Sequence, residues 1–250
     1  MRKALVGVVA GVMLGAFSMV SAVELSAGVS GVFGMDFGAG LLGISEKWDD
    51  EEFSTSVPWT GGGFNVFFDA TYAELGVGLT FGGGKPKLVY NGKDITSEEY
   101  GDEELKMSFT ALNLSLVGKY PIAIANNMTI FPLAGIEYKM VLSGKTTYGN
   151  EEEKWDGKTV TYGDEFYSYT YADHKASEFS RFGLKFGAGM DIALNDNMFL
   201  RPVVAYNLRF ANKISKDEID GWEEWADDDD EVKATMGHGL TISVGLGFRF

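Results

Sequence analysis

Apolar residues alternate with small or polar residues along most of this chain, and the alternation is clearest at its end, from His238 to Phe250. The apolar positions there are Leu240, Ile242, Val244, Leu246, Phe248 and Phe250. Because successive side chains of a strand point to opposite faces, a period of two predicts a strand with one apolar and one polar face.

Seven earlier segments share this period of two. They cover residues 24–38, 64–71, 73–83, 108–122, 129–142, 181–194 and 199–210. The gaps alternate between long polar loops, at residues 39–63, 84–107, 143–180 and 211–236, and tight turns, at Thr71–Tyr72, Ala123–Asn127 and Asn195–Asn197. Long loops at one rim, short turns at the other and an even strand number are typical of transmembrane barrels. The pattern predicts an all-β fold, an eight-stranded antiparallel up-and-down transmembrane β-barrel; a soluble β-sandwich is the alternative.

The N-terminal segment has the features of a secretory signal peptide. Arg2 and Lys3 precede an apolar stretch over residues 4–20, and small residues at Ser21 and Ala22 suit a cleavage site. We expect residues 1–22 to be a cleaved signal peptide and residues 23–250 to be one barrel domain. An uncleaved membrane anchor is the alternative. The sequence holds no Cys, which excludes disulfides and thiolate metal sites.

The signal peptide, the eight alternating strands, the loop pattern and the ending Gly-Leu-Gly-Phe-Arg-Phe resemble the small eight-stranded outer-membrane β-barrel superfamily. The nearest analogies are the OmpA transmembrane domain, OmpX and OmpW types. The resemblance implies a bacterial outer membrane, contact with outer-membrane lipid, and insertion by the assembly machinery, which reads Phe248 and Phe250 as its signal. Both termini are expected on the periplasmic side. No catalytic or binding motif is carried over from these families.

The long loops carry the excess negative charge. The formal net charge is −15, and loss of Arg2 and Lys3 with the signal peptide takes it to −17. The predicted strands hold as many basic as acidic residues, so the loops carry the whole excess. Acidic loops argue against nucleic acid and against anionic ligands as loop partners.

Most charged residues of the strands fall on the inward face, where unpaired buried charge is costly. The predicted lumen ion-pair network comprises Glu24, Asp36, Asp69, Glu74, Lys119, Glu137, Lys139, Arg181, Lys185, Asp191, Arg201, Arg209 and Arg249. The tight turn at 195–197 sets Asp191 opposite Arg201 on one face. Inward glycines such as Gly28, Gly189 and Gly247 are expected to leave space for the long Arg and Lys side chains.

Two further contacts are expected near the periplasmic rim. Closure of the barrel brings Glu24, at the start of the first strand, to Arg249, at the end of the last. Asp69 and Glu74 face each other across the first turn and need a cation, for which Lys119 is the candidate. The first three strands contribute acidic residues to the lumen, and the later strands contribute most of the basic ones. Side chains of the two walls either form ion pairs that fill the lumen or, if water separates them, create an electric field across a narrow pore.

The loops themselves contain signs of structure. Asn91-Gly92 and Gly163-Asp164 each lie between β-prone residues, which predicts two hairpins. Exposed strand edges and tyrosines could bind an extracellular ligand or host surface, or the loops could simply be soluble. The acidic runs at 49–52, 151–153 and 227–231 could bind Ca²⁺, but none has the spacing of a recognised calcium loop, which favours a solvated acidic face.

Catalysis ranks last among the functions considered. The two histidines, His174 and His238, lie outside any diagnostic motif, although Thr241 and Ser243 follow His238 closely. We therefore predict no enzyme, no catalytic residue, no cofactor and no metal site. The sequence favours a surface structural or interaction protein with a largely filled lumen. A narrow porin-like channel for small solutes or hydrophobic molecules comes second, and a lipid-acting enzyme is a distant third.

Overall fold

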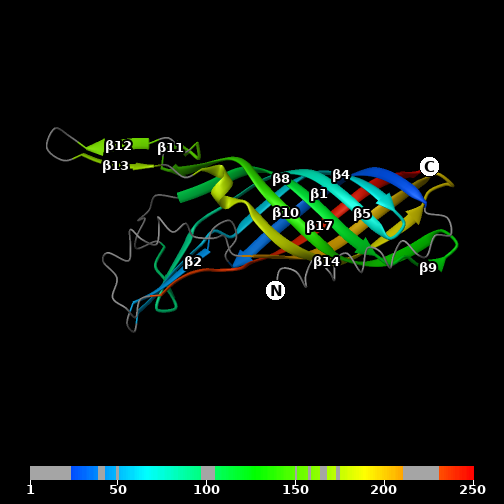
Figure 1. Ribbon diagram of the computed structural model, residues 1–250, viewed down its shortest axis with the longest axis horizontal. Coiled ribbons are helices and arrows are strands. Elements are labelled where there is room, and N and C mark those ends of the chain that lie inside the picture. The colour runs from blue at the N-terminus through cyan, green and yellow to red at the C-terminus, as the bar shows by residue number, and fades with distance from the viewer. Residues whose placement is uncertain are drawn as a thin grey trace, which may run out of the picture.

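The described residues form a closed antiparallel β-barrel, and further strands extend beyond one of its ends (Figure 1). The computed structural model describes residues 24–38, 43–48, 51–96, 105–149, 151–156, 159–163, 168–172, 175–210 and 231–250. The C-terminus lies at the opposite end from the additional strands, beside the short turns (Figure 1).

The barrel wall consists of eight strands, which confirms the predicted fold class. They are β1 (Leu25–Gly38), β4 (Trp59–Ala70), β5 (Ala73–Gly84), β8 (Leu105–Lys119), β10 (Met128–Tyr148), β14 (Arg181–Ala193), β15 (Met198–Arg209) and β17 (Gly237–Arg249). Each pairs with its neighbour in chain order, and β17 pairs with β1 to close the barrel. The eight-stranded wall therefore has no free strand edge, which is the condition for a β-barrel that spans a lipid bilayer.

Three strands differ clearly in extent from the sequence prediction, and one of them, β10, continues to Tyr148, past the predicted end at residue 142. β4 begins at Trp59, before the predicted start, because Gly61–Gly63 pair with β5 although they carry no side chain to show the alternation. β8 ends at Lys119, and Ile122–Ala125 form a separate strand, β9, that pairs with the start of β10. Pro121 separates β8 from β9 and has no N–H to continue the ladder.

The alternation places apolar side chains on the outside and charged side chains inside, as predicted. Phe64 and Phe68 of β4 are more than half exposed, whereas Asp69 between Phe68 and Ala70 is 6% exposed. The exposed large apolar residues of the wall include Val29, Phe33, Phe81, Ile136, Phe186, Val204, Ile242 and Phe248. A continuous exposed apolar band around a polar interior is the pattern of a barrel surrounded by lipid.

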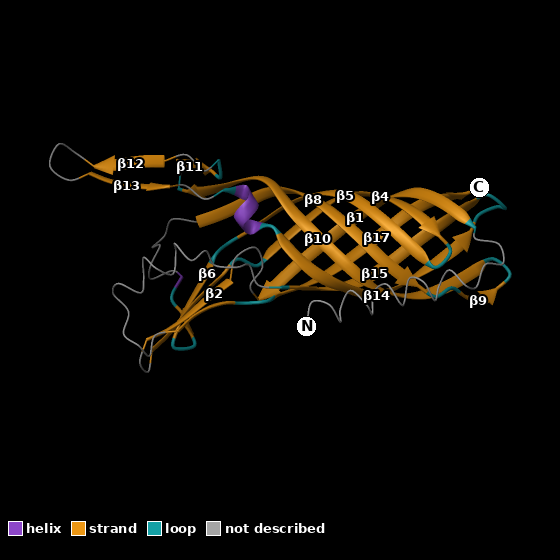
Figure 2. Cartoon of the chain, viewed as in Figure 1, coloured by secondary structure: helices purple, strands orange, loops and turns teal. Residues whose placement is uncertain are grey.

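Three separate loops combine beyond the barrel rim into one antiparallel sheet (Figure 2). Its order is β16 (Glu231–Ala234), β2 (Gly43–Trp48), β3 (Glu51–Ser56), β6 (Lys87–Tyr90) and β7 (Lys93–Asp94). β6 and β7 form the hairpin predicted at Asn91-Gly92, where both turn residues have positive φ angles of 46° and 78°.

The loop between β10 and β14 forms its own projection. It contains β11 (Glu151–Lys154), the hairpin of β12 (Thr159–Gly163) and β13 (Ser168–Ala172), and the short helix η1 (Ala176–Phe179). The β12–β13 pairing confirms the second predicted hairpin. Among the described residues, no helix is long and apolar enough to cross a membrane.

Candidate functional site

The lower lumen, toward the short turns, is crossed by one guanidinium. Arg201 of β15 donates from Nε to Asp191 Oδ1 over 2.6 Å, from Nη2 to Asp69 Oδ2 over 2.7 Å, and from Nη1 to Glu74 Oε2 over 2.7 Å. Lys119 of β8 also pairs with Asp69. Because β15 lies across the barrel from β4 and β5, the contacts of Arg201 with Asp69 and Glu74 cross the lumen. We call these five residues the lower ion cluster.

Three inward phenylalanines enclose the Arg201 guanidinium. Its carbon lies 4.7 Å from the ring centroids of Phe67 and Phe199 and 5.2 Å from that of Phe131. All three rings are almost completely buried. The lower lumen is therefore closed by paired charge packed among aromatic rings.

The inward glycines serve these rings rather than the long cationic side chains, which corrects the sequence expectation. A Cβ added at Gly28, Gly189 or Gly247 would collide with the ring of Phe67, Phe131 or Phe199 respectively. Each phenylalanine lies over a glycine of a neighbouring strand. The alternation pattern did not predict this packing. It assigns polar or small residues to the inward face, and the three phenylalanines are exceptions to that pattern.

The structure brings together Asp191 with Arg201 and Lys119 with Asp69, but not Glu24 with Arg249. Among the described residues, the guanidinium of Arg249 lies 5.1 Å over the ring of Phe199 and forms no ion pair with Glu24. Glu24 lies directly before the first residue of β1, and its backbone N–H donates to Thr71 Oγ1. The ion pairs of Arg201 with Asp69 and Glu74 could not be predicted from the sequence, because they depend on which strands face each other across the closed barrel.

A second cluster crosses the lumen nearer the loops. Arg209 of β15 pairs with Asp36 of β1 and donates to Glu137 of β10 over 3.2 Å. Lys185 of β14 lies 3.6 Å from the other oxygen of Glu137. Asp36 and Arg209 are almost fully buried. These four residues form the upper ion cluster.

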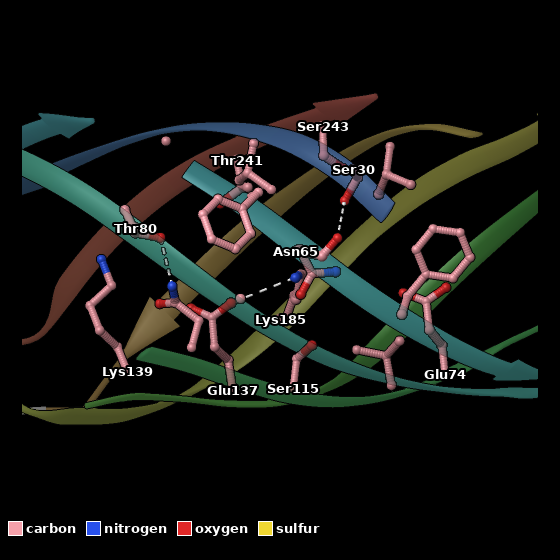
Figure 3. A pocket seen from close by; sticks show the side chains of 18 of the residues that line it. Ser30, Asn65, Glu74, Thr80, Ser115, Glu137, Lys139, Lys185, Thr241 and Ser243 are labelled. Carbon is pink, nitrogen blue, oxygen red and sulfur yellow. Dashed lines mark hydrogen bonds and ion pairs between the residues drawn. The ribbon is translucent and has the colours of Figure 1, made fainter. Parts of the chain in front are cut away.

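A cavity of about 70 Å³, lined by both polar and apolar side chains, lies in the lumen (Figure 3). Its lining includes residues of both ion clusters together with the hydroxyl and amide side chains of Ser30, Asn65, Thr80, Asn113 and Thr241. This volume holds only a few water molecules, since a water occupies roughly 30 Å³ in the liquid. We call it the lumen chamber.

The mouth of the barrel is closed by aromatic side chains. The Trp59 and Phe109 rings pack edge to face with centroids 5.1 Å apart, and Trp155 stacks on Phe179 at 4.2 Å. They belong to one buried apolar cluster with Val57, Ala111, Val141 and Ala176. We call this cluster the mouth plug.

A β-bulge makes room for the mouth plug. The pairing of β10 with β8 shifts between Val141 and Ser143, so that Gly144 and Thr146 take inward positions. Trp155 lies against Gly144, where a Cβ would collide with its indole, and its Nε1 donates to Thr146 Oγ1 over 2.9 Å. The sequence signal for this arrangement is weak, since the bulge and a single glycine decide it.

Two inward cations of the predicted network, Lys139 and Arg181, lie opposite each other on β10 and β14 beneath the plug. The Lys139 ammonium lies 3.4 Å from the Trp59 ring centroid, and Arg181 Nη1 donates to the backbone carbonyl of Thr235 over 3.4 Å. Neither pairs with a carboxylate among the described residues.

The histidine and hydroxyl residues considered for catalysis lie on opposite faces of β17. His238 faces outward, where its Nδ1 shares a hydrogen bond of 2.5 Å with the Tyr206 hydroxyl. Thr241 and Ser243 line the lumen chamber. His238 therefore does not pair with the Thr241 or Ser243 hydroxyl. His174 lies outside the described residues.

Two loop carboxylates, Glu152 and Asp94, are held by local contacts. Lys145 Nζ donates to Glu152 Oε1 over 2.5 Å, and this hydrogen bond lowers the pKa of Glu152. Hydrogen bonds from Thr96 lower the pKa of Asp94. Within the described ranges, no group of three or more potential ligands could hold a metal ion. Residues 227–230 of the acidic run at 227–231 lie outside those ranges.

Comparison of the sequence with protein-family models identifies a matching family. Residues 11–250 match the family model described as the outer membrane protein beta-barrel domain. No curated protein matches the chain.

Several solved structures are similar over most of their length. Neisserial surface protein A is 9% identical and covers 90% of this chain and 97% of its own, with a TM-score of 0.40. OprG from Pseudomonas aeruginosa is 11% identical and covers 92% and 96%, with a TM-score of 0.42. A major outer membrane protein from Thermus thermophilus is 15% identical and covers 90% and 99%, with a TM-score of 0.43.

Proposed function

The chain belongs to the outer membrane protein beta-barrel domain family, and from this premise we propose that it is a surface interaction protein whose filled barrel holds a structured extracellular sheet. Its family places it in a bacterial outer membrane, with the apolar outer face of the barrel in contact with lipid. The proposal concerns what the barrel presents outside that membrane.

The joining of three loops into one sheet carries the proposal. β2 and β3 come from the loop after β1, β6 and β7 from the loop after β5, and β16 from the loop before β17. Loops that needed only to be soluble would not have to pair with one another. A rigid surface supported by a barrel is the usual form of a binding site built from loops.

The sheet offers two terminal strands, β16 and β7, to a partner. Terminal strands present unpaired backbone groups to which an extended segment can add by β-augmentation. β7 is only two residues long, so the longer β16 is the better acceptor. We propose an extended protein segment of a host or neighbouring cell surface as the ligand class.

The test replaces the extracellular sheet without changing the barrel. Residues 43–56 would be replaced by a short Gly/Ser linker, which removes β2 and β3 from the middle of the sheet. We expect cells bearing this variant to lose adhesion to immobilised matrix proteins, while heat-modifiable barrel migration stays unchanged. A matched control removes β12 and β13, which form a separate sheet. Equal adhesion of the parent and the β2–β3 variant would contradict the proposal.

A narrow channel is the second candidate, and the lumen chamber is the observation that favours it. The chamber is lined by polar and apolar side chains, among them residues of both ion clusters. The clusters and the mouth plug oppose conduction, because each closes the lumen with buried side chains. We therefore rank conduction below surface interaction, and catalysis below both.

We further propose that residues 1–22 are removed on export and that both termini are periplasmic. The C-terminus lies beside the short turns, away from the extracellular sheet (Figure 1). Phe250, which is 84% exposed, and Phe248 are then available to the assembly machinery as the last aromatic residues of an amphipathic strand.

A further inference from the structure

The cations at the outer end of the lumen chamber exceed the carboxylates around them. Within the described part of the chain, Lys139, Arg181, Lys185 and Arg209 lie in this region with only Asp36 and Glu137. Both carboxylates are already used by Arg209, and Glu137 is shared with Lys185. Two positive charges are left over.

Lys139 is the cation whose surroundings compensate it least. Lys139 is 3% exposed, and its Nζ has no hydrogen-bond partner among the residues that the structure describes. The Trp59 and Phe109 rings, at 3.4 Å and 5.2 Å, face it from the mouth plug. Arg181 lies opposite it in the sheet register, and like charges in that position repel each other.

The chamber beside Lys139 supplies further donors. Thr80 accepts a hydrogen bond from Asn113 over 2.6 Å, and Thr241 accepts one from Asn207 over 2.6 Å. Each threonine hydroxyl therefore keeps its own hydrogen to donate. Both line the chamber with Lys139 (Figure 3).

From the excess charge, the uncompensated ammonium and these donors, we propose that the outer end of the lumen chamber binds a small inorganic anion, with Lys139 as its principal ligand. A halide there offsets one of the two surplus charges, which burial otherwise makes costly. A halide is the smallest candidate for a cavity of about 70 Å³ and is therefore the anion that we test. This inference is independent of what the extracellular sheet binds.

Bromide is the probe for the site. Crystals of the complete barrel grown in detergent would be soaked in sodium bromide, and anomalous scattering measured at the bromine absorption edge. We expect a peak in the chamber in contact with Lys139 Nζ. Absence of a peak there, or peaks only on the outer surface, would overturn the proposal.

A solution experiment tests the role of Lys139. Thermal unfolding in detergent would be compared in sodium chloride and sodium gluconate at equal ionic strength. A bound halide stabilises the folded state in proportion to ln(1 + [L]/Kd), so the parent should melt higher in chloride. The Lys139→Met variant should melt at the same temperature in both salts.

Lys119→Met is the matched control, because Lys119 is as deeply buried but already pairs with Asp69. It should keep the chloride effect even if it is less stable overall. A chloride effect that survives in Lys139→Met would also overturn the proposal. If a variant does not fold, the bromide experiment on the parent protein still decides the question.

Discussion

At the scale of single residues, Arg201 organises the lower lumen. Its guanidinium donates to Asp69, Glu74 and Asp191, which come from three different strands. Its depth within the barrel means that these carboxylates depend on it for compensation, together with Lys119. Paired charge of this kind contributes little net stability over apolar packing, but removal of one partner leaves the others buried and unpaired.

We predict that Arg201→Met destabilises the barrel by about 3–5 kcal/mol, as for other broken buried ion pairs. Urea unfolding in lipid vesicles would measure this. Arg249→Met is the control, because Arg249 contacts Phe199 without an ion pair among the described residues, and it should cost no more than about 1 kcal/mol. Similar losses in the two variants would contradict the assigned role of Arg201.

At the scale of elements, the extension of β10 beyond the wall depends on local contacts. Its last residues pair with β11, and Lys145 holds Glu152 across that pairing. The bulge after Val141 turns this extension so that Trp155 fits over Gly144. The short β10–β11 ladder therefore links an exposed ion pair to the mouth plug.

This ladder should open more readily at acidic pH. The pKa of Glu152 is lowered in the folded state by its hydrogen bond to Lys145. A lowered folded pKa gives stability that is present above the ordinary value of 4.5 and is lost as the pH falls through the folded value. Hydrogen exchange of the β10–β11 amides should thus accelerate below about pH 4.5 relative to barrel amides.

Glu152→Gln provides the comparison. It should exchange faster than the parent at neutral pH, and the difference should vanish at low pH. An unchanged rate at neutral pH would show that the ion pair does not stabilise the ladder.

At the scale of the whole molecule, the lumen is closed at three levels. From the short turns outward these are the lower ion cluster, the upper ion cluster and the mouth plug, with the lumen chamber between the ion clusters. The five-stranded sheet formed by the loops lies beyond them (Figure 2). The barrel and the side chains that fill its lumen therefore form a rigid support. The sheet beyond the rim provides the interaction surface that we propose.

Conductance in planar bilayers tests this arrangement. The parent should show no single-channel conductance above background. The double variant Trp59→Ala with Arg209→Ala should show small openings, because it weakens both the mouth plug and the upper ion cluster. Phe64→Ala is the control, since Phe64 faces outward and leaves the lumen intact. A conducting parent would favour the channel over the filled barrel.

Much of this protein was determined by its sequence alone, because the alternation of apolar and polar residues is a local property. It predicted the eight strands, the short turns at 71–72 and 195–197, the hairpin at Asn91-Gly92 and the placement of Asp191 opposite Arg201, which a short turn dictates. It failed where alternation carries no information, as at Gly61–Gly63 and at the start of β9.

Only the tertiary structure decided which distant residues meet. Closure of the barrel brings Arg201 to Asp69 and Glu74, leaves Lys139 beside Trp59, and keeps Arg249 from Glu24. It also joins three loops into one sheet. These contacts depend on the register, the bulge and the diameter of the closed sheet, which no single strand specifies.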